Sequence, residues 1–371
     1  MSAATLSPQE GERVVVAMSG GVDSSLAAAL SVEQGCETIG VTMQLSTGSS
    51  RCCSLADADD ARRVAEKLGV RFFVANYAEA FRKEVIEAFA DGYLAGRTPI
   101  PCVACNKRFK FDHLLERAHV FGAQRVATGH YARIDRDART GKLRLLRARD
   151  LEKDQSYFLF QLDQEQLEKA WFPLGEMRKD EVRERARALG LATADKPESQ
   201  EICFVPEGRY VDVIEQVRPE ARERGGELVD EAGNVLGRHP GVHHFTVGQR
   251  HGLGLSLGRK LYVSHIDPKS RRVSVSGLAG IASTDAEIED VWWLSGDPPG
   301  KSLQARVQVR HRHVGALASL LATPSRGARV HFEEPVRAVA PGQAAVFYDV
   351  DEPDVVLGGG WIASTAKRVH A

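Results

Sequence analysis

The sequence SGGVDSS occupies residues 19–25, between an apolar run at 13–18 and a segment at 23–34 whose apolar residues recur at helical spacing. A continuous apolar run is typical of a strand that is buried on both faces of a parallel sheet. Glycines let the backbone turn tightly and approach a ligand, and a helix start offers N–H groups and a positive dipole end. The sequence therefore predicts a strand, a phosphate-binding loop and a helix. No Gly-Lys-Ser/Thr follows, so the loop is not of the Walker A type, and Asp23 is a candidate Mg²⁺ ligand.

The segments that follow continue this alternation. Strands are expected at 13–18, 37–44, 70–75 and 125–132, and helices at 23–34, 57–68, 81–94 and 106–121. Such alternation predicts an α/β fold with a mostly parallel sheet. From about residue 225, short Val-rich segments alternate with Gly, Pro and Asp turns, which indicates a small β-barrel or sandwich. We therefore expect an α/β domain at 1–205, a small β-rich central domain at 206–280 and a C-terminal β-barrel at 281–371.

Composition excludes several classes of protein. The chain has 371 residues, 49 Lys and Arg against 50 Asp and Glu, and 43% hydrophobic residues, which are values typical of globular proteins. No window approaches 18 apolar residues and the N-terminal segment has no apolar core, so we expect no membrane segment, no secretion signal and a cytoplasmic location. Six cysteines are too few for a disulfide framework in a chain of this length.

Positive charge is concentrated in the second half of the chain. Residues 238–272 contain seven Arg and Lys but a single acidic residue, Asp267, and residues 301–314 contain four Arg and Lys and no acidic residue. Such stripes suit contacts to nucleic-acid phosphates, although a solvated barrel face is the alternative. His243 and His244 lie in the first stripe. We expect them at the surface, because no cysteine or carboxylate stands near them at a metal-binding spacing.

Two cysteine segments carry a second candidate site. Cys102-x-x-Cys105 precedes the helix expected at 106–121, and Cys203 stands alone near the end of the α/β region. A thiol at or just before a first helical turn, next to lysines and arginines, has a lowered pKa and is reactive. The alternative is a pair of buried, apolar cysteines. Spacing alone does not bring Cys203 to Cys105.

Cys52 and Cys53, with Asp57 and Asp60, are interpreted as a loop and a helix start rather than as a metal site.

The loop at 19–25 resembles the pyrophosphate loop of the N-type ATP pyrophosphatases, which cleave ATP to AMP and pyrophosphate. Further motifs resemble the tRNA-specific 2-thiouridylase family along nearly the whole chain. They are GRTPIPCVACNKRFKF at 96–111, TGHYAR at 128–133, KDQSYFL at 153–159, ICF at 202–204, TVGQRHGLG at 246–254 and PGQAAV at 341–346.

This resemblance implies ATP-dependent 2-thiolation of the wobble uridine of tRNA, by adenylylation of O2 and sulfur transfer from a cysteine persulfide. It implies that Cys105 is the nucleophile and Cys203 the persulfide carrier, while Cys102 stands where some relatives have Asp and its role is open. The ATP-binding residues it implies are Ala17, Met18, Ser19, Gly20, Gly21, Val22, Asp23, Ser24, Met43 and Gly129. The tRNA-binding residues it implies are Ile100, Pro101, Cys102, His130, Lys153, Asp154, Gln155, Arg310, His311 and Gln343.

The implied cofactors are ATP and Mg²⁺. The implied partners are a tRNA and a sulfur donor, either a cysteine desulfurase or a sulfur-relay carrier, and the chain is expected to be a monomer. Three alternatives stay open. Cys102, Cys105 and Cys203 are also a donor set for a [4Fe–4S] cluster. A carbon–nitrogen ligase of the GMP synthetase type shares the ATP loop, and a non-catalytic RNA-binding protein would retain the loop as a relic.

Overall fold

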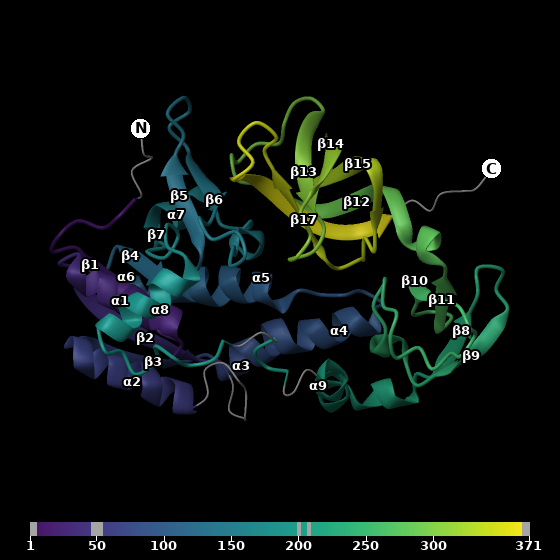
Figure 1. Cartoon of the computed structure of the whole chain (residues 1–371), viewed down its shortest axis with the longest axis horizontal. Helices are drawn as coiled ribbons and strands as arrows, with labels where there is room; N and C mark the ends of the chain where they lie inside the picture. The colour runs from purple at the N-terminus through teal and green to yellow at the C-terminus, as the bar shows by residue number, and fades with distance from the viewer. Residues whose placement is uncertain (1–5, 46–54, 199–201, 206–208, 366–371) are drawn as a thin grey trace.

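The computed structural model describes residues 6–45, 55–198, 202–205 and 209–365, so Cys52 and Cys53 lie outside the described residues. An α/β unit forms one end of the molecule, a β-barrel lies beside it, and a small sheet lies at the other end (Figure 1). The α/β unit, the central sheet and the terminal barrel confirm the predicted fold class.

The α/β unit is built on a five-stranded parallel sheet in the order β3-β2-β1-β4-β7. Its strands are β1 (Arg13–Ala17), β2 (Glu37–Gln44), β3 (Arg71–Asn76), β4 (Arg125–Thr128) and β7 (Ala170–Trp171). Successive strands run outward from β1 in both directions. Ligands of such sheets bind at the carboxyl ends of the strands where the order reverses, which here is between β1 and β4.

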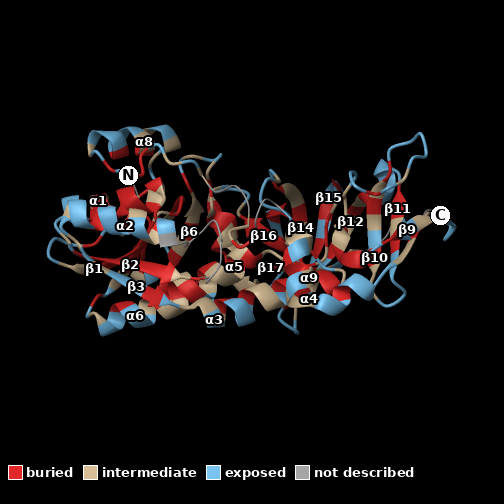
Figure 2. Cartoon of the chain, turned by 90° about the horizontal axis from the view of Figure 1, so that it is seen from below, coloured by how far each residue is buried: buried red, intermediate tan, exposed pale blue. Residues whose placement is uncertain are grey.

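Helices cover this sheet and extend from it. They are α1 (Val22–Glu33), α2 (Leu55–Leu68), α3 (Ala78–Phe81), η1 (Arg82–Glu87), α4 (Ala88–Leu94), α5 (Pro101–Cys105), η2 (Asn106–His113), α6 (Leu114–Val120), η3 (Ser156–Phe158), α7 (Gln164–Lys169) and α8 (Lys179–Ala188). Buried residues line the sheet, whereas the outer faces of α2 and α8 are exposed (Figure 2). For α2 this is the amphipathic pattern that the apolar spacing of residues 57–68 predicts, whereas α8 was not predicted.

The central region joins two helical turns to a four-stranded sheet in the order β10-β11-β8-β9. Its elements are α9 (Tyr210–Val217), η5 (Pro219–Glu223), β8 (Gly226–Val229), β9 (Val235–His239), η6 (Val242–His244), β10 (Tyr262–Asp267), β11 (Arg272–Ser276) and η7 (Leu278–Ile281). Helix α9 lies beside α4, where Arg218 binds Asp91 at 2.8 Å. The central region therefore contacts the α/β unit through α9.

Six antiparallel strands form the C-terminal barrel, which the pairing of β12 with β17 closes. They are β12 (Ala282–Trp293), β13 (Leu303–Gln308), β14 (Ala316–Thr323), β15 (Gly327–Arg337), β16 (Ala344–Tyr348) and β17 (Val355–Thr365). The hairpin β5 (Ala132–Arg136) and β6 (Leu143–Arg147) extends this sheet, because β6 pairs with β17 at Leu146 and Val355. The α/β unit and the barrel thus share a sheet.

Two expected boundaries are wrong. The helix expected from residue 106 begins at Pro101, which occupies the first helical position, a place that proline favours because it has no N–H to satisfy there. Cys105 therefore lies a full turn inside the helix, whereas Cys102 lies in its first turn. The strand expected at 125–132 breaks after Thr128, and β5 starts at Ala132 in a different sheet.

Candidate active site

The phosphate loop has a backbone that only glycine accommodates at its first turn. Gly20 has φ +72°, and a Cβ built there would lie 2.2 Å from the carbonyl oxygen of Asp57. A side chain at this position would require both a left-handed backbone and displacement of the start of α2. Gly129, which follows β4, is equally constrained, since a Cβ would lie 2.7 Å from the backbone nitrogen of Ser24. These close approaches place the ends of β1 and β4 against the start of α1.

Serine hydroxyls hold the loop in shape from within. The Ser24 hydroxyl accepts a hydrogen bond from the Ser19 N–H at 3.0 Å and donates to the Gly21 carbonyl oxygen at 3.0 Å. The Ser25 hydroxyl donates to the same carbonyl at 2.9 Å. The first N–H groups of α1 have no acceptor within the helix, and they point out of its start with the positive end of its dipole. This loop can therefore bind an anion such as a phosphate.

Lysines surround the loop, each held by carboxylates. Lys179 Nζ donates to both oxygens of Asp23, at 2.7 and 2.8 Å, and lies 2.8 Å from Glu198. Lys196 Nζ donates to the Gly20 carbonyl oxygen at 3.0 Å and to Asp57 and Asp60 at 2.7 and 2.6 Å. Each of these ammonium groups is a ready counter-charge for an incoming phosphate, which would compete with the carboxylates for it.

Glu198 links this lysine group to Lys153, whose Nζ donates to it at 2.7 Å. Burial opposes ionisation of Glu198, but the hydrogen bonds from Lys153 and Lys179 outweigh it and lower its pKa to about 2. Asp23 also accepts a hydrogen bond from the Tyr131 hydroxyl at 2.8 Å. Asp23, Asp57, Asp60 and Glu198, the four carboxylates described at and around the loop, thus already have lysine partners. As they lie, these carboxylates do not fit a Mg²⁺ ion.

The two cysteine segments, distant in sequence, meet at one hydrophobic cluster. Cys105 and Cys203 are both half-buried, and both pack against the core that includes Phe81, Phe109 and Phe204. Phe81 lies edge-on to Phe109 at 5.4 Å and to Phe204 at 5.9 Å between ring centroids. One ring thus contacts the helix that follows Cys105 and also the residue that follows Cys203.

Met43, expected to bind ATP, belongs to the same cluster. It is buried near the carboxyl end of β2, next to the strand that leads into the phosphate loop. The cluster therefore reaches from the cysteine segments to the carboxyl edge of the parallel sheet. Of the residues expected to bind ATP, Ala17 and Met43 thus share a core with the two cysteines, whereas Met18 and Val22 pack in the other core of the α/β unit.

Three of the residues expected to bind tRNA, Pro101, His130 and Asp154, are buried. His130 is 6% exposed and Asp154 is 7% exposed. Desolvation and the charge of Lys110 lower the pKa of His130 well below its ordinary value, so the ring is neutral at pH 7. Since the ammonium of Lys110 can only donate to Nε2, at 3.2 Å, Nδ1 carries the proton and donates to the Thr128 hydroxyl at 2.7 Å. Asp154 accepts hydrogen bonds from the Ala148 N–H and the Ser156 hydroxyl, so both residues organise loops in this conformation.

Arg310, His311 and Gln343, which are also expected at tRNA, belong to the barrel region. The His311 ring lies against Phe158 at 4.5 Å between centroids, and Arg310 is exposed beside it. Gln155 accepts a hydrogen bond from the Tyr131 N–H at 3.0 Å. Gln343 donates to the Thr98 carbonyl oxygen at 2.8 Å, which holds the segment before α5 on the barrel. Ile100 and Pro101 line a cavity of about 280 Å³ between α4, α5 and the barrel.

The seven basic residues of the 238–272 stripe are all exposed. They are Arg238, Arg250, Arg259, Lys260, Lys269, Arg271 and Arg272. One loop of this stripe, residues 250–261, lines a hollow of about 350 Å³. The positive face is therefore accessible, as phosphate contacts require.

Tyr131, Lys179, Lys196 and Glu198 were not predicted from the sequence. Their only signal was a position inside or near matched segments, because the contacts of the first three span more than 100 residues of sequence, and the bond from Lys153 to Glu198 spans 45. Such ion pairs depend on tertiary packing, so no local pattern of residue types reveals them.

Three family models match the chain between residues 12 and 362. Residues 12–207 match the tRNA methyl transferase HUP domain, residues 212–277 the tRNA methyl transferase PRC-barrel domain, and residues 283–362 the aminomethyltransferase beta-barrel domain. The chain is 49% identical over 368 residues to the tRNA-specific 2-thiouridylase MnmA of Solibacter usitatus, covering 94% of this chain and 98% of the relative. It is 48% identical over 379 residues to the protein of the same name from Rhodospirillum rubrum, covering 98% and 100%.

A solved 4-thiouridine synthetase–RNA complex with bound ATP matches with a TM-score of 0.39 and 19% identity, over 56% of this chain and 51% of that chain. Within the described residues, the structure holds no helix long and apolar enough to cross a membrane.

Proposed function

Because the chain belongs to the family of tRNA-specific 2-thiouridylases, we propose that it uses ATP to replace the C2 oxygen of a tRNA wobble uridine with sulfur. It is a tRNA sulfurtransferase. The observation that carries the reaction scheme is the shared cluster, which joins the Cys105 and Cys203 segments to Met43 beside the phosphate loop.

The first step activates the uridine. In the proposal, the N–H groups at the start of α1 and the loop at 19–25 bind the ATP phosphates. Uridine O2 attacks the α-phosphorus, the bond to the β-phosphate oxygen breaks, and pyrophosphate leaves. Lys179 and Lys196 are the nearest described cations to the loop, and each can turn from its carboxylate to the phosphates as negative charge develops. The C2 oxygen becomes part of an AMP leaving group.

The second step transfers sulfur. We assign the persulfide to Cys203 and the attacking thiolate to Cys105. The thiolate attacks the inner sulfur of the Cys203 persulfide, the S–S bond breaks, and hydrosulfide leaves to attack C2 and expel AMP. A Cys105–Cys203 disulfide results, and a thiol reductant returns it to two thiols with two electrons. A cysteine desulfurase or a sulfur-relay carrier would load Cys203. This step requires Cys105 and Cys203 to come within reach of each other. The aromatic cluster against which both pack supports this requirement.

RNA binding in the proposal uses the exposed basic groups and the segment at the start of α5. Arg310, His311 and the seven basic residues of the 238–272 stripe would contact phosphates, and Ile100, Pro101 and Cys102 would face the target base. The buried His130 and Asp154 would act by holding the adjoining segments. A uridine in an anticodon loop can leave its stack at low cost, which suits reaction at C2.

The three cysteines also favour one alternative chemistry. Cys102 and Cys105 are three residues apart on a helix, so they share a face, and Cys203 packs on the same core. These thiolates are the ligands that would hold a [4Fe–4S] cluster, which would supply an iron that binds hydrosulfide when present. The rest of the scheme, with ATP activating O2, is unchanged.

One experiment tests the function and separates the two chemistries. The chain is purified without oxygen, its iron and acid-labile sulfide are measured, and it is incubated with unmodified tRNA, ATP and a sulfur donor. Mass spectrometry of the digested tRNA should show 2-thiouridine only when ATP is present. Protein free of iron should be active, and Cys102→Ser should retain activity. Four irons per active chain, with loss of iron and activity in Cys102→Ser, would overturn the persulfide scheme, and unmodified tRNA in all conditions would overturn the function.

A further inference from the structure

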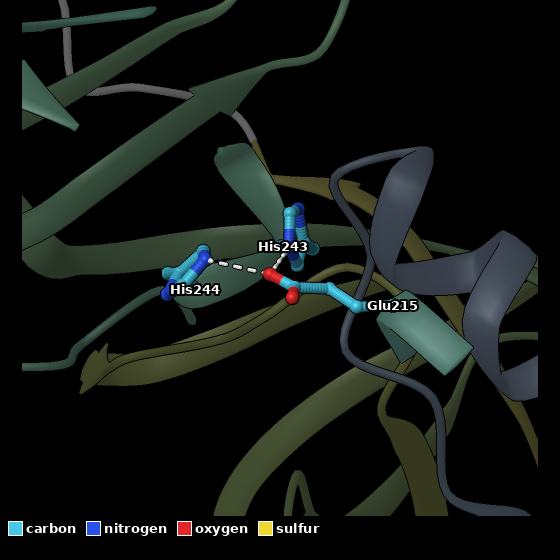
Figure 3. Close-up of side chains that lie close together, drawn as sticks. All are labelled: Glu215, His243 and His244. Carbon is cyan, nitrogen blue, oxygen red and sulfur yellow. Dashed lines mark hydrogen bonds and ion pairs between the residues drawn. The ribbon is translucent and has the colours of Figure 1, made fainter. Parts of the chain in front are cut away.

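Glu215, His243 and His244 form a cluster far from the phosphate loop, at the junction of α9 with the central sheet (Figure 3). Glu215 comes from α9, whereas His243 and His244 are neighbours in the short turn η6. The two imidazole rings lie 4.5 Å apart between centroids, and both face one carboxylate oxygen. The expectation that these histidines lie at the surface is wrong for His243, which is 0% exposed.

The separations in this cluster match those between ligands of one metal ion. Glu215 Oε1 lies 3.4 Å from His243 Nε2 and 3.6 Å from His244 Nε2, and one ligand atom from each residue falls within 4.8 Å of the others. Tetrahedral ligands about 2.1 Å from a zinc ion are roughly 3.4 Å apart. The cluster therefore needs little movement to surround an ion.

Hydrogen bonding accounts for only one of these two contacts, because His243 Nε2 lies at hydrogen-bond distance, 3.4 Å, from Glu215 Oε1. The distance of 3.6 Å between His244 Nε2 and the carboxylate is longer than a hydrogen bond, and this buried nitrogen has no hydrogen-bond partner among the described residues. Buried polar atoms are normally satisfied, so the unsatisfied atoms here indicate a missing ligand. A cation between the imidazoles and the carboxylate would bind the lone pairs that face it.

Neighbouring residues hold the three side chains in place. Arg222 Nε donates to the other carboxylate oxygen of Glu215 at 2.9 Å, which leaves Oε1 directed at the histidines. Gly241 makes room for the His243 ring, because a Cβ at that position would lie 2.3 Å from its Cε1 atom. Supporting contacts of this kind are typical of metal sites, where they orient the ligands.

We propose that Glu215, His243 and His244 bind one Zn²⁺ ion, with a water molecule as the fourth ligand. Two neutral imidazoles and a carboxylate are a zinc donor set. The ion would pin η6 to α9, which in turn packs on α4 through the Arg218–Asp91 ion pair. The site would be structural, and it would fix the basic central region relative to the α/β unit.

Cobalt substitution tests this proposal on the full chain. Metal-free protein is titrated with Co²⁺, whose visible bands report tetrahedral coordination, and Zn²⁺ is then added to displace it. We expect one tetrahedral Co²⁺ per chain, bound by nitrogen and oxygen ligands. A thiolate ligand would add a near-ultraviolet band, so the absence of that band would distinguish this site from binding at the cysteines. Glu215→Gln and His244→Ala should weaken binding by about ten-fold or more.

His331→Ala is the matched control, because His331 pairs with Asp285 at 2.8 Å on the exposed barrel surface and belongs to no three-residue metal-ligand group among the described residues. This variant should bind Co²⁺ as the unaltered chain does. If a variant does not fold, the melting temperature of the unaltered chain serves instead, and it should rise by several degrees on addition of equimolar Zn²⁺. Equal affinity in His244→Ala and the unaltered chain, a thiolate band alone, or an unchanged melting temperature would overturn the proposal.

Discussion

The phosphate loop and the cysteine pair belong to the same α/β unit, but the chain builds them in different ways. The loop is made by neighbours in sequence, whose glycines and serines bond to one another. Cys105 and Cys203 come from distant segments that both pack against the aromatic cluster around Phe81. A local change should therefore damage the loop alone, whereas a packing change should damage the cysteine pair and leave the loop intact.

Removal of the proposed persulfide carrier should separate the function of the cysteine pair from that of the phosphate loop most clearly. Cys203→Ala should reduce thiolation to background, because no other residue in the scheme receives the sulfur, and should leave ATP and tRNA affinities unchanged. Nucleoside mass spectrometry and equilibrium binding measure the two effects. Cys36→Ala is the control, since Cys36 packs against the opposite core cluster, and it should be fully active. Normal thiolation by Cys203→Ala would remove the assigned role.

A substitution in the phosphate loop should instead lower the affinity for ATP. Gly20→Ala places a Cβ against the Asp57 carbonyl at a positive φ, and ATP affinity should fall by about ten- to a hundred-fold, which corresponds to strain of about 1–3 kcal/mol. Nucleotide titration measures this. Gly69→Ala is the matched control, because Gly69 has φ +68° with open space around it. Its ATP affinity should be unchanged; an equal loss in both variants would show that general destabilisation is the cause.

Loosening the aromatic cluster tests the other half of the comparison. Phe81→Leu should lower the free energy of unfolding by about 1–2 kcal/mol and slow thiolation several-fold, with little change in ATP affinity. Phe332→Leu removes a ring that is equally buried, but in the barrel core. This variant should lower the free energy of unfolding by a similar amount without slowing thiolation. If both variants slow thiolation alike at a temperature where both are folded, the cluster has no specific role in joining the cysteines.

The same contrast between local and tertiary features separates what the sequence predicts from what it does not. The parallel sheet, the loop and the barrel follow from apolar periodicity and glycine placement, which are local signals. The pairing of β6 with β17 joins residues more than 200 positions apart, and Glu215 lies 28 residues before His243. His243 and His244 were therefore interpreted as surface residues, because the carboxylate that faces them comes from another element and does not appear at any local spacing.

The smallest effect is expected at Glu198, which joins the lysines of the loop to Lys153. Its folded-state pKa, about 2, lies below the ordinary value of 4.5, so its contribution to stability is fully present above pH 4.5 and is lost as the pH falls toward 2. Glu198→Gln should thus lower the free energy of unfolding at pH 7 by less than about 1 kcal/mol, since the ion pairs are partly exposed.

Urea unfolding between pH 7 and pH 3 measures this difference in the free energy of unfolding, which should shrink steadily below pH 4.5. Glu220→Gln, which removes an exposed carboxylate on η5, should show no such trend. A difference for Glu198→Gln that is constant across this range would mean that the ion pairs with Lys153 and Lys179 do not depress the pKa, and that the lysines are not restrained by Glu198 before the nucleotide arrives.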